Sequence, residues 1–296
     1  MSRTSKIDAL LQSPPSTALA GQLVAWADAT RDRIARSEME VGLLSIDEVL
    51  KIPTAYQTAA QQGDPNAWIT LAWWHARPDV GNADLKAAEK AMRAAIDANV
   101  ATATLELAKM RWFFKRQTAT KPEENEAYQL VSEVVNSDPD NADALYILAL
   151  LTTHGFGVTA SPKRGFELLE QSAALGNTDA LFEIYIHHAK GIGVPIHEKR
   201  ALQACQRAAD AGHPRAMYNM GAFNAAGRGM PKDIPEAIKW YERAADAGNP
   251  SAMVGLAVIY ATGDGVETNP FYAQEMFDQA EYHGLDVSHI REAVGL

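Results

Sequence analysis

Glycine pairs separated by one residue are the first feature of the sequence that could do chemistry. They recur every 36 residues, at Gly155/Gly157, Gly191/Gly193, Gly227/Gly229 and Gly263/Gly265. Glycine-rich loops bind phosphate when they follow a strand and open a helix, because backbone N–H groups then face the anion. Here each pair closes a helical pattern, so we interpret the glycines as helix ends. The sequence also contains no Gly-x-Ser-x-Gly, His-Glu-x-x-His or Walker motif.

The eight histidines and the single cysteine are the other candidates for chemistry. His187 and His188 are adjacent and would point about 100° apart on a helix, and the other histidines show no ligand spacing. We therefore expect no metal site and no cofactor. Cys205 lies in an alanine-rich helical pattern, which favours a buried small residue over a nucleophile. Carboxylates such as Glu236 and Glu242 fall on the expected solvated face, so the sequence predicts no catalytic residue and no enzyme.

Composition and charge restrict the partners. The chain has 296 residues, of which 47% are apolar and 22% charged, as in ordinary folded proteins. Its formal net charge of −10 repels phosphate backbones and anionic lipid, so we expect neither nucleic acid nor a membrane as partner. No stretch reaches the roughly 18 apolar residues of a transmembrane helix, and no signal-like run follows Met1. With one cysteine, these features favour a cytoplasmic protein over export by a route that needs no signal.

Two further landmarks keep the 36-residue period of the glycine pairs. One is an alanine followed by an apolar residue, and the other is a dipeptide that ends in glycine. The alanines are Ala144, Ala180, Ala216 and Ala252, and the closing glycines are Gly176, Gly212, Gly248 and Gly284. A period between roughly 20 and 50 residues indicates a solenoid, in which each unit contacts only its neighbours.

Each period contains two predicted helices. The first starts after a proline such as Pro214 or Pro250 and ends at the glycine pair, where glycine can adopt a left-handed conformation. The second carries pairs of alanines on one face, which let two helices approach closely: Ala88/Ala95, Ala201/Ala208, Ala237/Ala244 and Ala273/Ala280. No pattern of period two indicates a strand. We therefore predict an all-α fold, a right-handed α-solenoid of helix-turn-helix repeats.

Weaker copies precede the regular ones. Ala67 and Ala103 are 36 residues apart, whereas 41 residues separate Ala103 from Ala144, and we expect the five extra residues in the polar loop 116–122. Before these copies, amphipathic patterns predict helices at about 17–37 and 46–62, the second broken or kinked near Pro53. The predicted organisation is an N-terminal helical cap (1–55), two degenerate repeats (56–140), four regular repeats (141–285) and a C-terminal tail (286–296).

The regular copies resemble a known repeat. The segments 217–221, 227–229 and 236–248 are similar to the Sel1-like repeat, a relative of the tetratricopeptide repeat. The resemblance is specific over residues 141–285 and weaker over 56–140. In two departures, the tyrosine before the glycine loop remains only as Tyr260, and Gly165 replaces a second-helix alanine. The resemblance implies a cytosolic or secreted adaptor for protein partners without activity of its own. In bacteria such proteins serve as signalling adaptors, secretion-system accessories and immunity proteins that block a toxin.

The first helices of such arrays line the inner, concave wall. With the repeat alanine as position zero, positions +3, +6 and +10 then point away from the core and into the groove. These positions give the predicted partner-binding residues Trp73, Arg77, Glu106, Lys109, Phe113, Ile147, Leu150, Glu183, Ile186, Lys190 and Asn219.

Several of these positions are large and apolar, which admits two interpretations. An exposed apolar stripe with a charged rim would bind a helix or loop of a partner. Alternatively, tight superhelical curvature buries side chains such as Ile147 and Leu150 against neighbouring repeats. The aromatic clusters at 73–74 and 112–114 lie in the degenerate copies, where the loss of repeat character reflects either a specialised contact or a poor fit.

The leading hypothesis is a non-catalytic protein–protein interaction scaffold whose groove binds a protein partner. An adaptor is one form of it, and an immunity protein that inhibits a toxin is another, since the acidic chain would suit a basic target. A different hypothesis is a regulatory sensor whose groove binds a peptide or a small ligand.

Overall fold

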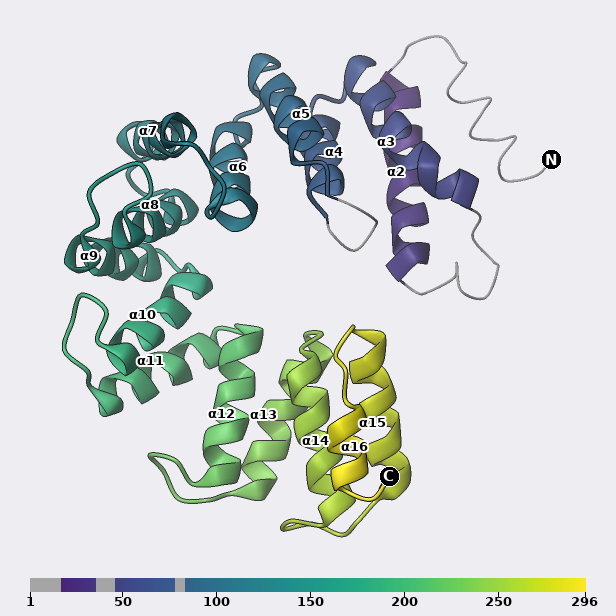
Figure 1. Ribbon diagram of the computed structural model, residues 1–296, viewed down its shortest axis with the longest axis vertical. Helices are drawn as coiled ribbons and strands as arrows, with labels where there is room; N and C mark the ends of the chain where they lie inside the picture. Colours follow the sequence, from purple (N-terminus) through teal and green to yellow (C-terminus); the bar gives the residue numbers. More distant parts are fainter. Residues whose placement is uncertain (1–16, 36–45, 78–82) are drawn as a thin grey trace. The chain divides into compact units, whose positions relative to one another are not determined.

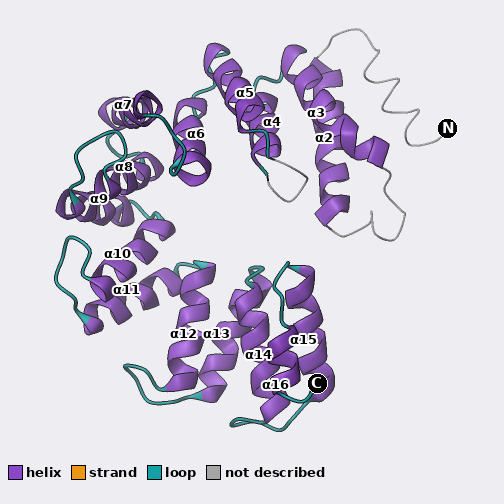
Figure 2. Cartoon of the chain, viewed as in Figure 1, coloured by secondary structure: helices purple, strands orange, loops and turns teal. Residues whose placement is uncertain are grey.

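The computed structural model of the protein describes residues 17–35, 46–77 and 83–296, and within these ranges it contains helices, turns and loops but no strand (Figures 1 and 2). The predicted all-α architecture is confirmed. The remaining parts of the predicted cap, 1–16 and 36–45, lie outside the described residues. The chain divides into two compact units, Met1–Ser137 and Asp138–Leu296.

In the described part of the N-terminal unit, two helices pack on each other before the first degenerate repeat. The second of these runs through Pro53 without a break, so of the two predicted effects of Pro53 the break is absent. The described helices of this unit are α2 (Thr17–Ala35), α3 (Ile46–Gln61), α4 (Ala67–Ala76), α5 (Leu85–Asp97), α6 (Ala103–Met110), a π-helical turn (Arg111–Lys115) and α7 (Lys121–Ser137).

The C-terminal unit consists of four pairs of 13-residue helices and a short final helix. Within it, each first helix packs on the second helix of its own repeat and on that of the preceding repeat. The helices are α8 (Ala142–His154), α9 (Pro162–Ala174), α10 (Thr178–Lys190), α11 (Glu198–Asp210), α12 (Pro214–Ala226), α13 (Ile234–Asp246), α14 (Pro250–Thr262), α15 (Pro270–Tyr282) and α16 (Ser288–Ala293), the last within the predicted tail.

Local hydrogen bonds fix both ends of the first helices. Asn141 accepts a bond from the N–H of Ala144 at 3.0 Å, and the equivalent cap of α12 is the imidazole of His213, which accepts from Ala216 at 3.2 Å. At the other end, Gly155 has a φ of 75° and its N–H donates to the Leu151 carbonyl. A side chain would be strained in that left-handed conformation, which explains why glycine recurs there.

A second recurring bond closes the loop between the two helices of a repeat. The carbonyl eight residues after the repeat alanine accepts the N–H of the residue that caps the second helix. The pairs are His75/Asp84, Thr152/Ser161, His188/His197, Asn224/Asp233 and Tyr260/Asn269, at 2.8–2.9 Å. Because the bond uses backbone atoms, the side chain at this position can vary. This tolerance explains why the tyrosine of the resembled repeat can be replaced in most copies.

The second copy lacks this bond and carries a buried arginine instead. Arg111 occupies the same position, and only 1% of its side chain is exposed. Its Nε donates to Glu89 Oε1 at 2.7 Å and its Nη1 donates to the Glu123 carbonyl at 3.1 Å, while Glu126 pairs with it at 2.9 Å. The guanidinium thus joins the π-helical turn to α5 and α7 through two carboxylates and one backbone carbonyl.

The five extra residues of the second copy are not in its polar loop, so that prediction was wrong. The second helices start at Leu85, Lys121 and Pro162, at the same distance from Ala67, Ala103 and Ala144. The loop of the second copy is therefore no longer than the others. Instead α7 has 17 residues where α5 and α9 have 13, and one further residue lies before α8. About one extra helical turn keeps the same face towards the core, which makes this extension compatible with stacking.

Candidate partner-binding surfaces

Three of the predicted partner-binding residues meet on the N-terminal unit. Trp73 of α4 donates its Nε1–H to Glu106 Oε2 of α6 at 2.9 Å, and Lys109 Nζ donates to Glu106 Oε1 at 2.9 Å. All three side chains are partly exposed. The Glu106 carboxylate, with both oxygens hydrogen-bonded, thus holds the indole of one repeat against the next, which orients the Trp73 ring at the surface.

Phenylalanines of the π-helical turn extend this cluster. Phe113 is 50% exposed and Phe114 is 39% exposed, whereas Trp112 beside them is buried. The Phe114 ring meets Trp73 edge to face at 5.8 Å between centroids. Phe113 was a predicted position, but Phe114 was not, because a regular α-helix would have turned it away from Trp73. We call Trp73, Glu106, Lys109, Phe113 and Phe114 the aromatic cluster.

Arg77 lies at the C-terminal end of α4, near but not within the aromatic cluster. Its guanidinium lies over the Trp74 ring at 5.9 Å. That ring is buried, so this contact covers part of the core. A cation on an aromatic face contributes about 0.5–1 kcal/mol at an exposed position, and here it fixes a positive charge beside the aromatic surface.

Two predicted residues of the C-terminal unit are buried. Ile147 has no exposed surface and Leu150 is 6% exposed, so of the two interpretations, burial holds for both. Their helix, α8, carries apolar side chains around most of its circumference, and a helix of that kind is covered on all sides. Neither side chain can therefore contact a partner unless α8 is displaced.

The other predicted residues of this unit keep some exposure. Glu183, Ile186 and Asn219 are half-buried and Lys190 is exposed. Burial raises the pKa of the Glu183 carboxyl, and the nearby Arg215 opposes this effect.

A stack of side chains lies beside Glu183. Phe182 is stacked on the His213 ring at 4.4 Å between centroids, and the Arg215 guanidinium lies over the Phe182 ring at 4.9 Å from its centroid. His213 Nε2 also pairs with Asp179 Oδ1 at 3.2 Å. This stack links α10 to α12 and was not predicted from the sequence.

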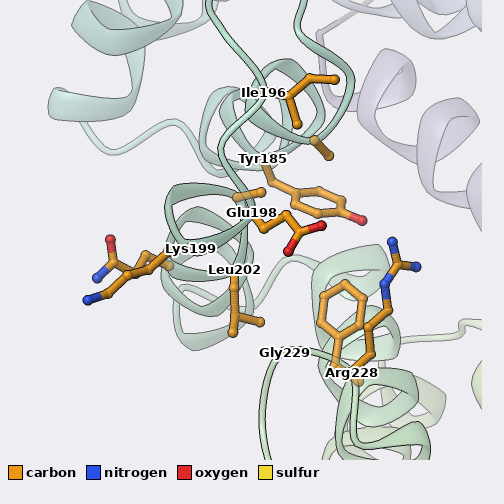
Figure 3. A pocket seen from close by; sticks show the side chains of 11 residues that line it. Tyr185, Ile196, Glu198, Lys199, Leu202, Arg228 and Gly229 are labelled. Carbon is orange, nitrogen blue, oxygen red and sulfur yellow. The ribbon is translucent and has the colours of Figure 1, made fainter.

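A cavity of about 610 Å³ opens in the C-terminal unit between α10, α11, α12 and the two adjoining loops. Its wall includes Tyr185, Leu202 and Phe223, and its rim includes Ile196, Glu198 and Arg228. Figure 3 shows the Tyr185 hydroxyl and the Arg228 guanidinium directed towards each other, while Lys199 points away. The position-based groove prediction missed all of these residues.

Beside the cavity, the two helices of a repeat meet through one large and one small side chain, and in this repeat the large side chain is on the first helix instead of the second. Tyr185 is the one aromatic residue at a position that is otherwise small, and its counterpart on the second helix is the small Cys205. In the other repeats the sizes are reversed, as in Ala149/Leu169, Gly221/Tyr241 and Ala257/Phe277. A Cβ on Gly221 would lie 2.6 Å from the Tyr241 ring, which shows how tightly these pairs fit. The aromatic residue at 185 was the sequence signal that could have indicated the cavity.

The same exchange explains Gly165, the second departure from the resembled repeat. A Cβ at this position would lie 1.9 Å from Thr153 Oγ1 and 2.9 Å from the Ala149 carbonyl oxygen. The other regular repeats have alanine in place of Thr153 and alanine in place of Gly165, as in Ala189 and Ala201. The larger side chain on the first helix therefore requires the smaller residue on the second.

The candidates for chemistry occupy structural positions. Burial raises the pKa of the Cys205 thiol to about 12, and its Sγ lies 3.7 Å from the Ala216 carbonyl. His187 and His188 are buried around the Phe166 ring, and burial lowers the pKa of both. Among the described residues, no three His, Cys, Asp or Glu side chains are grouped as metal ligands. No described helix has both the length and the apolar composition for crossing a membrane.

The paired helices and their stacking define this chain as an α-solenoid protein of the helix-turn-helix repeat class. The family model of the Sel1 repeat matches residues 142–177, 186–213, 214–249 and 250–285. These four stretches are therefore Sel1 repeats, and the predicted repeat family is confirmed over them. A comparison with curated protein sequences found no match.

Solved structures share the fold. The Sel1 repeat protein from Oxalobacter formigenes is 27% identical, with 76% of this chain and 94% of that chain covered and a TM-score of 0.57. A protective antigen present in uropathogenic Escherichia coli strains is 20% identical, over 94% of this chain and 59% of its own, with a TM-score of 0.52. The immunity protein Pa5087 from Pseudomonas aeruginosa is 17% identical, over 79% and 89%, with a TM-score of 0.52.

Proposed function

We propose that this protein is a non-catalytic scaffold that binds another protein, and that the aromatic cluster of the N-terminal unit is one of its contact surfaces. The observation that carries the proposal is the exposure of Phe113 and Phe114 beside Trp73 and the Glu106–Lys109 ion pair. Exposed aromatic side chains next to charges are typical of the few residues that supply most of the binding energy in a protein interface.

The packing within the cluster supports this assignment. Trp73 and Glu106 are fixed by a hydrogen bond between two repeats, so their side chains lose little conformational freedom when a partner binds. Phe113, in contrast, is 50% exposed, and a partner that covers its ring would remove apolar surface from water. A rigid base with an exposed aromatic edge is suited to a helix or loop of a partner.

A specific form of the proposal is an immunity protein that inhibits a toxin. It is supported by the fold shared with Pa5087 of Pseudomonas aeruginosa, a protein named as an immunity protein. The net charge of −10 supports it as well, because it would accelerate the encounter with a basic target. The proposal places the protein in the cytoplasm, where a single cysteine stays reduced.

Affinity capture from the source organism, with the full chain as bait, tests the proposal. We expect the wild-type chain to retain a stoichiometric protein partner that Trp73→Ala and Phe113→Ala lose. Phe271→Ala is the matched control, because Phe271 is 83% exposed and lies outside the aromatic cluster. Circular dichroism of each variant verifies the fold. Partner retention by both cluster variants would show that this surface does not bind, and recovery of no stoichiometric partner would contradict the scaffold.

A further inference from the structure

The cavity of the C-terminal unit exposes apolar surface that the fold does not require. Ile196 is 65% exposed at the rim, and Phe223 and Leu202 are only partly covered. At about 610 Å³ the cavity is within the range of roughly 300–1,000 Å³ of ligand pockets. Tyr185 forms the wall between α10 and α12, where it meets the Phe223 ring at 6.2 Å. The walls are thus suited to a large apolar side chain.

The rim carries a cation that has no carboxylate partner in the part of the chain that the structure describes. Arg228 is the central residue of a glycine pair, and its guanidinium lies 5.8 Å from the Phe223 ring centroid. Two of its three counterparts in the regular repeats have structural roles: Phe156 is buried, and Asp264 pairs with Lys232 at 2.8 Å. Arg228 has no such role and is exposed at the cavity.

The polar groups around Arg228 favour an anion over a cation. The Tyr185 hydroxyl is directed towards Arg228 (Figure 3), so both groups present donors to the same space. Glu198 also lies at this rim, but it is the first residue of α11, where the helix N-terminus stabilises its negative charge. Because Glu198 is stabilised locally and Arg228 is not, Arg228 is the group that a ligand would complement.

We propose that this cavity binds an acidic segment of the protein partner, in which an aromatic or aliphatic side chain enters the cavity and a neighbouring carboxylate pairs with Arg228. The inference rests on the proposed scaffold function and specifies the chemistry of the segment that a second contact surface recognises. Tyr185 and Phe223 contact the apolar side chain, and the Tyr185 hydroxyl donates a second hydrogen bond to the carboxylate. Such a charge-assisted pair discriminates a carboxylate from its neutral amide.

Three tetrapeptides that differ in one residue test the charge preference. The probes are Ac-Gly-Phe-Glu-Gly-NH2 and the same peptide with Gln or Lys in place of Glu, titrated into the ¹⁵N-labelled full chain. We expect the Glu peptide to shift the amide signals of residues 227–229 and 198–203. The Gln peptide should bind roughly tenfold more weakly, because a neutral amide forms a weaker hydrogen bond with the Arg228 guanidinium than a carboxylate does.

Variants then assign the discrimination to Arg228. In Arg228→Gln the affinity for the Glu peptide should fall roughly tenfold, to that of the Gln peptide, whose own affinity stays unchanged. Arg215→Gln is the matched control, because Arg215 also lies over an aromatic ring, at 4.9 Å from Phe182, but outside the cavity. It removes the same charge and should leave all three affinities unaltered.

Three outcomes would overturn the proposal. Tightest binding of the Lys peptide, lost in Glu198→Gln, would reverse the charge of the ligand. Equal binding of the three peptides would remove the role of Arg228. The absence of any shift at residues 227–229 would show that the cavity is not a binding site. Because these titrations use no partner, their failure is distinguishable from the failure of affinity capture, which tests the scaffold itself.

Discussion

The contact of Tyr241 with two glycines allows a quantitative test of the packing between repeats. A Cβ built on Gly221 of α12 would lie 2.6 Å from two carbons of the Tyr241 ring, and a Cβ on Gly255 of α14 would lie 2.9 Å from it. The ring of α13 therefore touches both first helices, and a shift away from α12 is limited by α14. Gly221→Ala should overpack this contact.

The magnitude follows from two opposing effects. In an open helical position, alanine in place of glycine stabilises by about 0.5–1 kcal/mol. Forcing a methyl group into a filled core costs about 1–3 kcal/mol. We therefore expect Gly221→Ala to lower the free energy of unfolding by about 1 kcal/mol. Gly21→Ala on α2, where no atom lies within 4 Å of the new methyl group, should raise it by about 0.5–1 kcal/mol.

Urea denaturation followed by circular dichroism measures both effects. A thermodynamic cycle with Tyr241→Leu supplies the control within the same unit, because Ala with Leu is the pair that Ala149 and Leu169 form in another repeat. In the Tyr241→Leu background the cost of Gly221→Ala should disappear. If Gly221→Ala stabilises the protein equally in both backgrounds, the reasoning about exchanged side-chain sizes is refuted.

Three further predictions concern stability. Arg111→Met should lower the free energy of unfolding by about 1.5–3 kcal/mol, because it removes the charge-assisted hydrogen bonds of a buried guanidinium, while Glu89 keeps Lys115 and Glu126 keeps Arg93 as partners. Arg164→Met, which breaks an exposed pair with Glu167, should change it by less than about 1 kcal/mol, and equal effects in urea titrations would contradict the role of burial. Because burial lowers the folded-state pKa of His187 and His188 below 6.5, the unfolded chain binds protons more readily than the folded chain. The contribution of these two histidines to the free energy of unfolding should be fully present above pH 6.5 and decrease as the pH falls below 6.5, a decrease that His188→Gln reduces. Gly193→Ala should destabilise the protein by at least about 1 kcal/mol more than Gly176→Ala. Both glycines have positive φ, but only the methyl group added at 193 would meet backbone, 2.3 Å from the Pro162 oxygen; equal thermal midpoints for the two variants would argue against this contact.

The sequence predicted part of the aromatic cluster and none of the cavity. Trp73, Glu106, Lys109 and Phe113 follow from helical spacing, and the structure brings the first three into contact. Phe114 was missed because the π-helical turn changes the direction of side chains after Met110. The cavity was missed because its wall comes from two helices and two loops, and periodicity within one helix contains no information about such a surface.

In the four regular repeats, the period, the helices and the helix ends were determined by the sequence alone. Caps and glycine turns depend on hydrogen bonds between residues a few positions apart, so their residue types recur with the period. Only the tertiary structure decided three other features: the burial of Ile147 and Leu150, the position of the Arg111 guanidinium between neighbouring helices, and the greater length of α7. Their physical reason is packing, since what covers a side chain depends on the neighbouring helix and not on the spacing within its own.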